Sequence, residues 1–272
     1  MQPYIDKEAA ERDLGGLPFY AVYSEHPKAL LAHYHARFEL MYFFETKGCT
    51  YRCGATTHRI KSQTLLTVNP YEVHECASFG EGTKVLLLLV EPAMLGKHAD
   101  LFFHNFIEND GEIDTIFLQM RDEIRGEKSP LALAALLYRL LERMCRLYAR
   151  PRPSRLPLPP EKLTLVTDYI EENLSSPIHL ADCATLLYVS EGRFYHLFKQ
   201  ATGLSPTEYI EKRRIARACA LLTESTLPIT EIALATGFCD GAYFAKRFRT
   251  HMKKTPRVFR ADFLSELKKG EI

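Results

Sequence analysis

The sequence contains no tryptophan, and no apolar run in it approaches the ~20 residues that a membrane-spanning helix needs. It opens without the basic cluster and apolar stretch of a secretory signal. The 272 residues are 46% hydrophobic and 25% charged, which argues against a disordered or fibrous chain. At roughly 150 residues per domain, we expect about two domains. We also expect a cytoplasmic protein with no membrane partner.

A disulfide framework and an excess of charge of one sign are also lacking. The seven cysteines are an odd number scattered along the chain, which is typical of reduced thiols and agrees with a cytoplasmic location. The formal net charge is only +1, so the whole surface is not basic. The segment from Lys246 to Arg260, however, carries seven Lys or Arg and no acid, and this segment can face phosphates.

Strand-like runs separated by turn residues occupy the first third of the chain. Short strands at close spacing predict a small β-sandwich or barrel. Apolar residues at helical spacing then predict a helix near 113–124 and a longer helix after Ser129-Pro130. The expected strands are Leu17–Tyr23, Leu40–Glu45, Cys49–Cys53, Thr64–Val68 and Lys84–Val90.

The longer helix has apolar residues at 133, 137, 140, 144 and 147, a coiled-coil-like seam. Leu131, Leu136, Leu141 and Tyr148 widen the apolar stripe beyond one packing face. Two interpretations stay open: the helix lies between the sandwich and another helix of its own chain, or it forms a homodimer contact. In the second case Leu137 and Leu140 are the residues to test.

Prolines mark the boundary between two expected domains. The segment 151–160 favours extended backbone and forbids a continuous helix. We therefore expect a first domain over 1–150, a linker over 151–160 and a second domain over 161–272. The second domain is predicted to be helical throughout, over Lys162–Asn173, Leu180–Leu187, Ser190–Thr202, Pro206–Thr223, Ile229–Ala235, Asp240–His251 and Pro256–Lys268.

An internal repeat organises this helical domain. Phe194, Phe198, Pro206 and Tyr209 recur about fifty residues later as Phe244, Phe248, Pro256 and Phe259. Each phenylalanine pair follows a short helix, a tight turn and a capping residue, which is Ser190 or Asp240. The second turn is one residue longer and contains Gly237. Helix, turn and capped helix form a helix-turn-helix unit, and two such units joined by one central helix can reach two adjacent major grooves.

Residues 162–265 resemble the DNA-binding domain of AraC/XylS-family transcriptional regulators. The resemblance rests on 194–210, 232–248 and the closing Thr-Pro-Arg-Val-Phe-Arg of 255–260. It implies an α+β two-domain chain, with a cupin-like N-terminal β-barrel or sandwich with helices and a C-terminal all-α tandem helix-turn-helix domain. It also implies a sequence-specific DNA-binding regulator, which we expect to be an activator that contacts RNA polymerase, to act as a homodimer, and not to be an enzyme.

The exposed side of each predicted recognition helix supplies the candidate DNA contacts. Tyr195 and His196 occupy reading positions of the family, while the cations are assigned mainly to phosphates. Gly241 and Ala242 depart from the polar residues common in the family, so contact with thymine methyl groups is expected there. The full candidate set is Glu191, Gly192, Arg193, Tyr195, His196, Lys199, Gly241, Ala242, Ala245, Lys246, Arg249 and Lys253.

His33, His35 and Glu39 share one parity, so on an extended strand their side chains would point to one face. Together with His74 they resemble the three-His, one-Glu metal set of cupin barrels, a donor set that suits Fe(II), Mn(II), Ni(II) or Zn(II). Sensor domains of AraC-type regulators often keep such residues without a metal. The favoured interpretation is therefore an effector pocket lined by these four residues, with no resident cofactor.

Aromatic residues near the same strands are able to stack on a sugar or an aromatic ligand, so a sugar is one candidate for a small-molecule effector. Two other hypotheses stay open: a metal-cupin enzyme, such as a dioxygenase or a sugar isomerase, with the helical domain as an accessory, and an architectural DNA-binding protein without a ligand. The aromatic residues in question are Tyr20, Tyr34, Phe38, Tyr42, Phe44, Tyr51 and Tyr71.

Overall fold

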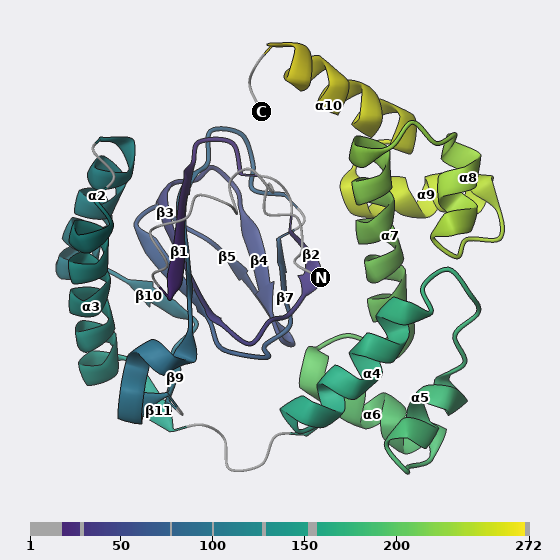
Figure 1. Ribbon diagram of the computed structural model, residues 1–272, viewed down its shortest axis with the longest axis horizontal. Coiled ribbons are helices and arrows are strands. Elements are labelled where there is room, and N and C mark those ends of the chain that lie inside the picture. The colour runs from purple at the N-terminus through teal and green to yellow at the C-terminus, as the bar shows by residue number, and fades with distance from the viewer. Residues whose placement is uncertain are drawn as a thin grey trace. The chain divides into compact units, whose positions relative to one another are not determined.

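The structure is a computed structural model that describes residues 18–27, 30–76, 78–99, 101–126, 129–151 and 157–269. The chain divides into two compact units, Met1–Leu156 and Pro157–Ile272. The division lies within the proline-rich segment, of which residues 152–156 lie outside the described part. Strands and two α-helices build the first unit, and helices build the second (Figure 1). Among the described residues, no helix combines the length and the apolar character needed to cross a membrane.

Two antiparallel sheets form the body of the first unit, so the expected sandwich of short strands is confirmed. A short third pair joins β9 (Leu101–Phe103) to β11 (Ala149–Pro151), and a 3-10 helix, η1 (Pro92–His98), follows the first sheet's second strand. The first sheet contains, in spatial order, β1 (Phe19–Ser24), β8 (Lys84–Val90), β3 (Phe38–Glu45), β6 (Thr64–Val68) and β10 (Phe106–Glu108). The second contains β2 (Leu30–His33), β7 (His74–Cys76), β4 (Thr50–Cys53) and β5 (Thr56–Arg59).

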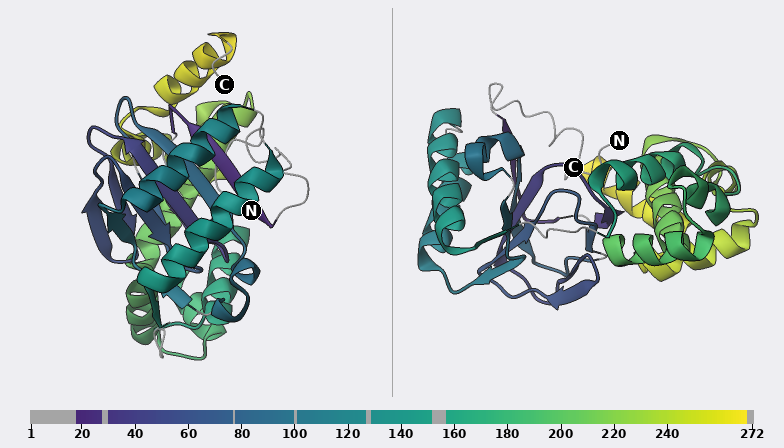
Figure 2. Two further views of the ribbon diagram at one scale, coloured as in Figure 1. Left: turned by 90° about the vertical axis from the view of Figure 1, so that its left-hand side faces the viewer. Right: turned by 90° about the horizontal axis from the view of Figure 1, so that it is seen from below.

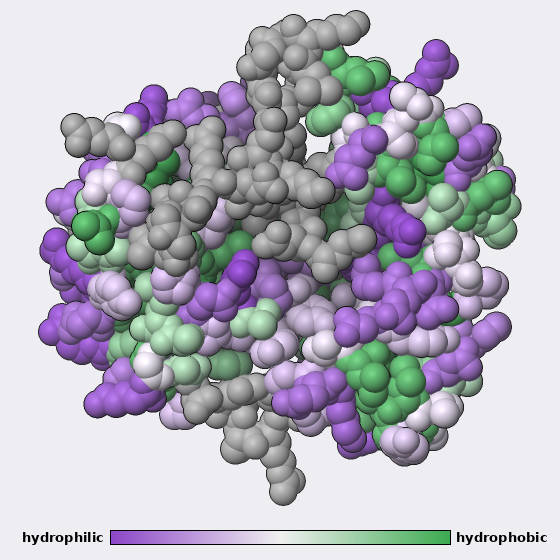
Figure 3. Space-filling model, viewed as in Figure 1, coloured by the Kyte–Doolittle hydropathy of each residue, from purple (hydrophilic) through white to green (hydrophobic). Residues whose placement is uncertain are grey.

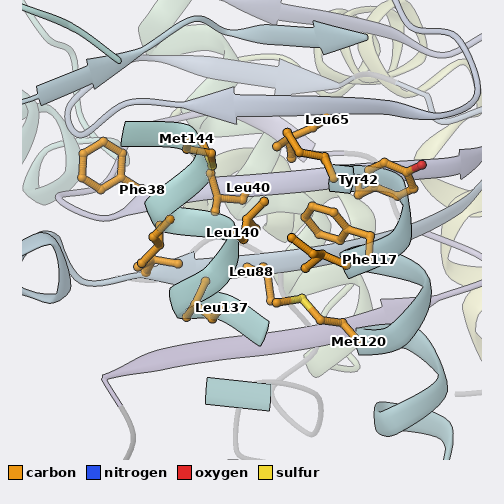
Figure 4. Close-up of a cluster of buried hydrophobic side chains, with 14 of the residues drawn as sticks. Phe38, Leu40, Tyr42, Leu65, Leu88, Phe117, Met120, Leu137, Leu140 and Met144 are labelled. Carbon is orange, nitrogen blue, oxygen red and sulfur yellow. The ribbon is translucent and has the colours of Figure 1, made fainter. Parts of the chain in front are cut away.

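Two helices, α2 (Gly111–Arg125) and α3 (Pro130–Leu147), cover the outer face of the five-stranded sheet (Figure 2, left). Tyr42 of β3 stacks on Phe117 of α2 with ring centroids 4.6 Å apart, and its hydroxyl donates to Asp114 at 2.7 Å. Figure 4 shows this cluster, in which α3 contributes Leu137 and Leu140. The other face of the sheet packs against the four-stranded sheet in a second apolar cluster.

The coiled-coil-like seam of α3 therefore packs within its own chain. Leu137 and Leu140 are fully buried against the sheet, so the hypothesis that these two residues form a dimer contact is wrong. The seam resembled an intermolecular one because a helix lying on a sheet needs the same apolar spacing as a helix lying on another helix. Leu131 and Tyr138, on the opposite side of α3, are 79% and 54% exposed.

The second unit has seven helices in its described residues, and each begins and ends within two residues of its predicted range. The α5–α6 pair and the α8–α9 pair lie toward opposite ends of the long helix α7 (Figure 1). The helices are α4 (Pro160–Glu172), α5 (Leu180–Leu186), α6 (Glu191–Thr202), α7 (Pro206–Glu224), α8 (Ile229–Ala235), α9 (Gly241–Met252) and α10 (Pro256–Lys269).

The sequence repeat has the same geometry in both halves. In α6, Phe194 and Phe198 are buried with ring centroids 5.6 Å apart, and Phe198 meets the ring of Tyr209 in α7 at 5.3 Å. In α9 the equivalent phenylalanines are also buried and 5.6 Å apart, and the second meets the α10 ring of Phe259 at 5.5 Å. Each recognition helix is thus fixed by aromatic packing along one face, so its opposite face remains in solvent.

A close backbone approach connects the second turn to the first half of the unit. Gly237, in the turn between α8 and α9, has a φ of 81°, and a Cβ there would lie 2.2 Å from the carbonyl oxygen of Leu174. Arg214 of α7 donates to the same carbonyl at 3.0 Å and to that of Ser176 at 2.8 Å. Only glycine fits this position, because a side chain would displace the backbone after α4.

We predict that Gly237→Ala destabilises the protein by about 3 kcal/mol, since the new methyl group adds overpacking to an unfavourable backbone conformation. Urea unfolding followed by circular dichroism of the full chain measures the change. The control is Gly192→Ala, because a Cβ at Gly192 meets no atom within 4 Å and alanine favours helix there. Equal stability of Gly237→Ala and wild type would show that the backbone at Gly237 does not lie against the carbonyl oxygen of Leu174.

Candidate nucleic-acid interface and ligand site

Helix α6 presents the first candidate reading surface. Its N-terminus is capped by Ser190, whose side chain accepts from the backbone N–H of Arg193 at 3.3 Å. The buried phenylalanines turn the opposite side of the helix toward solvent. The predicted contacts lie on that side: Tyr195 is half-buried, and Glu191, Gly192, Arg193, His196 and Lys199 are exposed.

Helix α9 repeats this arrangement. The carboxylate of Asp240 caps it by accepting from the backbone N–H groups of Ala242 and Tyr243 at 3.1 and 2.9 Å. The burial classes of residues 242–250 are the same, position by position, as those of residues 192–200. Of the predicted contacts, Ala242, Lys246, Arg249 and Lys253 are exposed, while Gly241 and Ala245 are half-buried.

Tyr243 is a surface residue that the sequence argument missed. It is 48% exposed, and its ring packs on Phe238 at 6.2 Å. Tyr243 lies fifty residues after Arg193, a predicted contact on α6, so the internal repeat already predicts an exposed side chain at position 243. An exposed tyrosine at this position offers a flat ring and a hydroxyl to a ligand.

The basic segment 246–260 presents fewer free cations than its composition suggests. Arg247 donates to Glu211 of α7 at 2.8 Å, and Arg260 donates to the carbonyl of Leu222 at 3.1 Å. Lys254 pairs with Asp262 at 2.6 Å. Part of the segment therefore holds α9 and α10 in place, and the assignment of its other cations to phosphates stays a prediction. Lys246, Arg249 and Arg257 are exposed.

A shallow depression lies along this end of α9. Its volume is about 510 Å³, and Lys246 and Arg249 supply positive charge to its wall beside Ala245, Thr250 and Thr255. On the face of the helical unit visible in Figure 3, apolar patches are small and separated by hydrophilic side chains. A depression lined by cations and hydroxyl groups is suited to a phosphate backbone.

The structure brings together the four residues of the predicted ligand site in the first unit. One ligand atom from each of His33, His35, Glu39 and His74 lies within 4.8 Å of the others. The prediction that His33, His35 and Glu39 lie on one face of a single strand is wrong, because β2 ends at His33 and β3 begins only at Phe38. The chain passes from one sheet to the other between these strands, and His33 pairs across strands with His74.

All three histidines are oriented by the backbone. The Nδ1 atoms of His33, His35 and His74 lie 2.7, 3.1 and 2.9 Å from the carbonyl oxygens of Leu31, Arg37 and Glu72. A carbonyl only accepts, so Nδ1 carries a hydrogen in each ring, and Nε2 is the nitrogen that gains or loses a proton. The hydroxyl of Tyr51 donates to Oε1 of Glu39 at 2.8 Å.

The charges within the cluster are strongly coupled. Burial alone would raise the pKa of Glu39, but the charge of His74 and a hydrogen bond from His35 hold that pKa well below its usual range. Burial would lower the pKa of His74, yet the Glu39 carboxylate raises it. Burial and the neighbouring His74 lower the pKa of His33 well below its usual value. Without a further ligand, the cluster contains an ionised Glu39 beside a neutral His33.

Most aromatic residues considered for ligand stacking are core residues. Phe38, Tyr42 and Tyr51 are buried, and Phe44 packs against Tyr42 at 4.8 Å. Tyr34 and Tyr71 lie near the cluster, with ring centroids 6.4 Å apart, and are half-buried. Of the predicted aromatic set, these two are therefore the best placed to meet a ligand that approaches His35.

Two family models match this chain, one in each unit. A model described as an AraC-like ligand binding domain matches residues 28–141, and one described as a helix-turn-helix domain matches residues 183–262. The chain belongs to the AraC family of transcriptional regulators. The prediction that the chain combines a ligand-binding domain with a DNA-binding helix-turn-helix domain is confirmed.

Named relatives of this AraC-family chain match it over different lengths. The uncharacterized HTH-type transcriptional regulator YfiF of Bacillus subtilis is 24% identical over 89% of this chain and 82% of its own length. The HTH-type transcriptional activator RhaR of Cronobacter sakazakii is 35% identical over 37% of this chain. The chain spans only 35% of the length of that relative.

A solved structure resembles the fold over most of the chain. The crystal structure of ToxT from Vibrio cholerae O395 is 13% identical, with a TM-score of 0.53 over 89% of this chain and 97% of ToxT. At this identity the likeness shows the fold alone. It agrees with a strand-rich N-terminal unit followed by a helical unit.

Glu211 is the residue through which α7 holds the second recognition helix, and it gives a testable prediction. It accepts from Arg247 at 2.8 Å and lies 2.6 Å from Nε2 of His251. We predict that Glu211→Gln lowers the free energy of unfolding by about 1–2 kcal/mol, because these contacts are partly exposed. The matched control is Glu224→Gln, an exposed residue of the same helix.

The same contacts predict how the free energy of unfolding depends on pH. Burial opposes ionisation of Glu211, but the hydrogen bonds from Arg247 and His251 outweigh it and lower the pKa of Glu211. Its stabilising contribution is therefore complete above the ordinary carboxyl pKa and is lost as the pH falls through the lowered value. Urea titrations between pH 3 and pH 7 should show the difference between wild type and Glu211→Gln shrinking toward low pH. A constant difference would contradict the assignment.

Proposed function

We propose that this regulator binds a specific promoter sequence through α6 and α9, and that a small effector bound in the N-terminal unit controls that binding. The observation that carries the proposal is the matched burial of the two recognition helices, each with one aromatic core face and one exposed polar face. A duplicated exposed surface is what reading two successive grooves requires.

The two helices would contribute differently to recognition. On α6, Arg193 and His196 are exposed donors able to meet base edges or phosphates. On α9, Lys246 and Arg249 line the depression and are assigned to phosphates, with Gly241 and Ala242 allowing close approach to thymine methyl groups. Helix α7 has 19 residues, or roughly 28 Å, which with its flanking turns suits the ~34 Å between successive major-groove turns.

The effector is assigned to the His33, His35, Glu39 and His74 cluster. The family match to a ligand-binding domain supports this assignment, and so does the concentration of polar side chains between two otherwise apolar sheets. His35 is the half-buried member, whereas the other three are buried, so a ligand would approach from its side. The polar donors and the two nearby tyrosines suit a small hydroxylated or anionic molecule, with a sugar as one candidate.

Activation is proposed as the mode of regulation, with RNA polymerase as the partner at the promoter. The support is the name of the Cronobacter relative, a transcriptional activator that matches the helical unit. A cytoplasmic location is proposed with it, supported by the odd number of cysteines scattered along the chain. In vitro transcription from the upstream region with purified polymerase would show more transcript with the protein than without it.

Fluorescence anisotropy with duplexes from the gene's own upstream region tests the DNA-binding proposal. We predict that His196→Ala weakens binding to the cognate duplex about 10- to 100-fold, and that Lys246→Ala weakens cognate and unrelated duplexes alike. Lys246→Ala should also reduce the slope of log K against log salt by about one. Lys162→Ala, an exposed charge change on α4, is the control and should leave binding unchanged.

Sequence-blind binding by the wild-type protein at physiological salt would contradict specific recognition. Equal losses from His196→Ala and Lys162→Ala would contradict the assignment of α6 to base reading. Each measurement is made on folded protein, checked by its thermal transition.

A homodimer is proposed through the outer face of α3. Leu131 and Tyr138 are seven residues apart and exposed, so they lie on one side of the helix, opposite the core seam. We predict that Leu131→Asp with Tyr138→Asp gives a monomer in sedimentation velocity at concentrations where wild type is a dimer. Leu165→Asp, at an exposed leucine of α4, is the control. A double variant that stays dimeric would place the interface elsewhere.

A further inference from the structure

We propose that His33, His35, Glu39 and His74 bind one divalent first-row transition-metal ion. This goes beyond the proposed function by assigning a resident ion to the ligand site. It rests on that proposal only for the location, because metal binding can be measured without DNA or effector.

The separation of the four donors fits one ion. Imidazole nitrogens and carboxylate oxygens bind such metals at about 2.0–2.2 Å, which places ligands around a common centre about 3 to 4.3 Å from one another. The four donor atoms here already lie within 4.8 Å of one another. Oε2 of Glu39 is 3.3 Å from Nε2 of both His35 and His74. A contraction of a few tenths of an ångström around an ion completes the site.

The rings are held as metal-binding histidines are held. Each Nδ1 faces a backbone carbonyl, those of Leu31, Arg37 and Glu72, so in the neutral ring Nε2 carries the lone pair, which an ion would take in place of a proton. Such outer hydrogen bonds fix the tautomer and the ring orientation of metal ligands. Tyr51 does the same for the carboxylate by donating to Oε1 of Glu39, which leaves Oε2 toward the histidines.

One buried atom in the cluster is left unsatisfied by the protein. Nε2 of His74 is buried and makes no hydrogen bond among the described residues. Glu39 lies at an ion-pair distance of 3.3 Å from it. A buried polar atom without a partner is costly. A bound cation would replace the proton on that nitrogen and also compensate the buried carboxylate of Glu39.

The donor set selects the class of ion. Three imidazoles and one carboxylate suit Fe(II), Mn(II), Co(II), Ni(II) or Zn(II), whereas Ca²⁺ and Mg²⁺ prefer oxygen donors alone. Four protein ligands leave one or two positions of a five- or six-coordinate ion open. The side chain of His35 is 18% exposed, against 2% for Glu39 and 0% for His74, so the open positions face the side of His35.

The ion would also join the two sheets. His33 and His74 come from the four-stranded sheet, and Glu39 comes from β3 of the five-stranded sheet. An ion held by both would bind the folded state and not the unfolded chain, so it should raise the melting temperature.

The experiment uses the full chain, free of any affinity tag, stripped with a chelator and then reloaded separately with Co(II) and Zn(II). Metal per chain is measured by inductively coupled plasma mass spectrometry after desalting, and Co(II) is also followed by its visible absorption. We expect close to one ion per chain, a visible Co(II) band and a higher melting temperature. A wild-type chain that retains no ion after desalting overturns the proposal.

Three variants separate a metal site from a buried polar network. His35→Ala removes the least buried ligand, so the chain should fold but retain almost no ion. Tyr51→Phe keeps all four ligands and should weaken binding about 10-fold by loosening Glu39. His98→Ala, at an exposed histidine of η1, should match wild type.

Two outcomes of the variant series are decisive. Metal content, Co(II) spectrum and melting temperature that are the same in wild type and His35→Ala would overturn the site. Promoter anisotropy measured on the metal-free chain is read independently, so that loss of DNA binding and loss of metal binding are distinguished.

Discussion

Both units depend on one constraint: a polar group can leave water only where another polar group meets it. In the first unit, the nearly buried carboxylate of Asp110 caps α2 and accepts from Arg143 at 2.9 Å and from Tyr148 at 2.6 Å, which joins α2 to α3. In the second, Arg214 satisfies the carbonyls after α4, against which the turn at Gly237 packs. These contacts are directional, so they determine which arrangement the apolar cores adopt.

The same constraint explains where chemistry can occur. The polar cluster around Glu39 lies between two sheets whose facing side chains are otherwise apolar, and there every histidine is oriented by a backbone carbonyl. The recognition helices reverse this distribution, because their aromatic residues are inside and their polar residues are in water. The proposed ligand site therefore consists of buried polar side chains, whereas the proposed DNA contacts are exposed polar side chains above a buried aromatic face.

The helical unit was predictable almost residue by residue. Caps such as Ser190 and Asp240 and the phenylalanine spacing are local signals, and the helices they predicted formed. The strand unit was predictable only in part, in the five strands β1, β3, β4, β6 and β8. Leu30–His33 and His74–Cys76 have only four and three residues, and their pairing depends on residues far away in the sequence. The apolar positions of α3 could be recognised in the sequence, but the sheet against which they pack could not.

The sequence by itself determined the two-unit organisation, the tandem recognition helices and the four residue types of the ligand site, because these follow from local periodicity, capping and a repeat. Only the tertiary structure decided how His33, His35 and Glu39 meet, since they converge where the chain passes between sheets and not along one strand. It also decided that Leu137 and Leu140 are core and that Arg247 pairs with Glu211. Contacts between distant segments depend on three-dimensional packing, which a linear pattern of residue types does not encode.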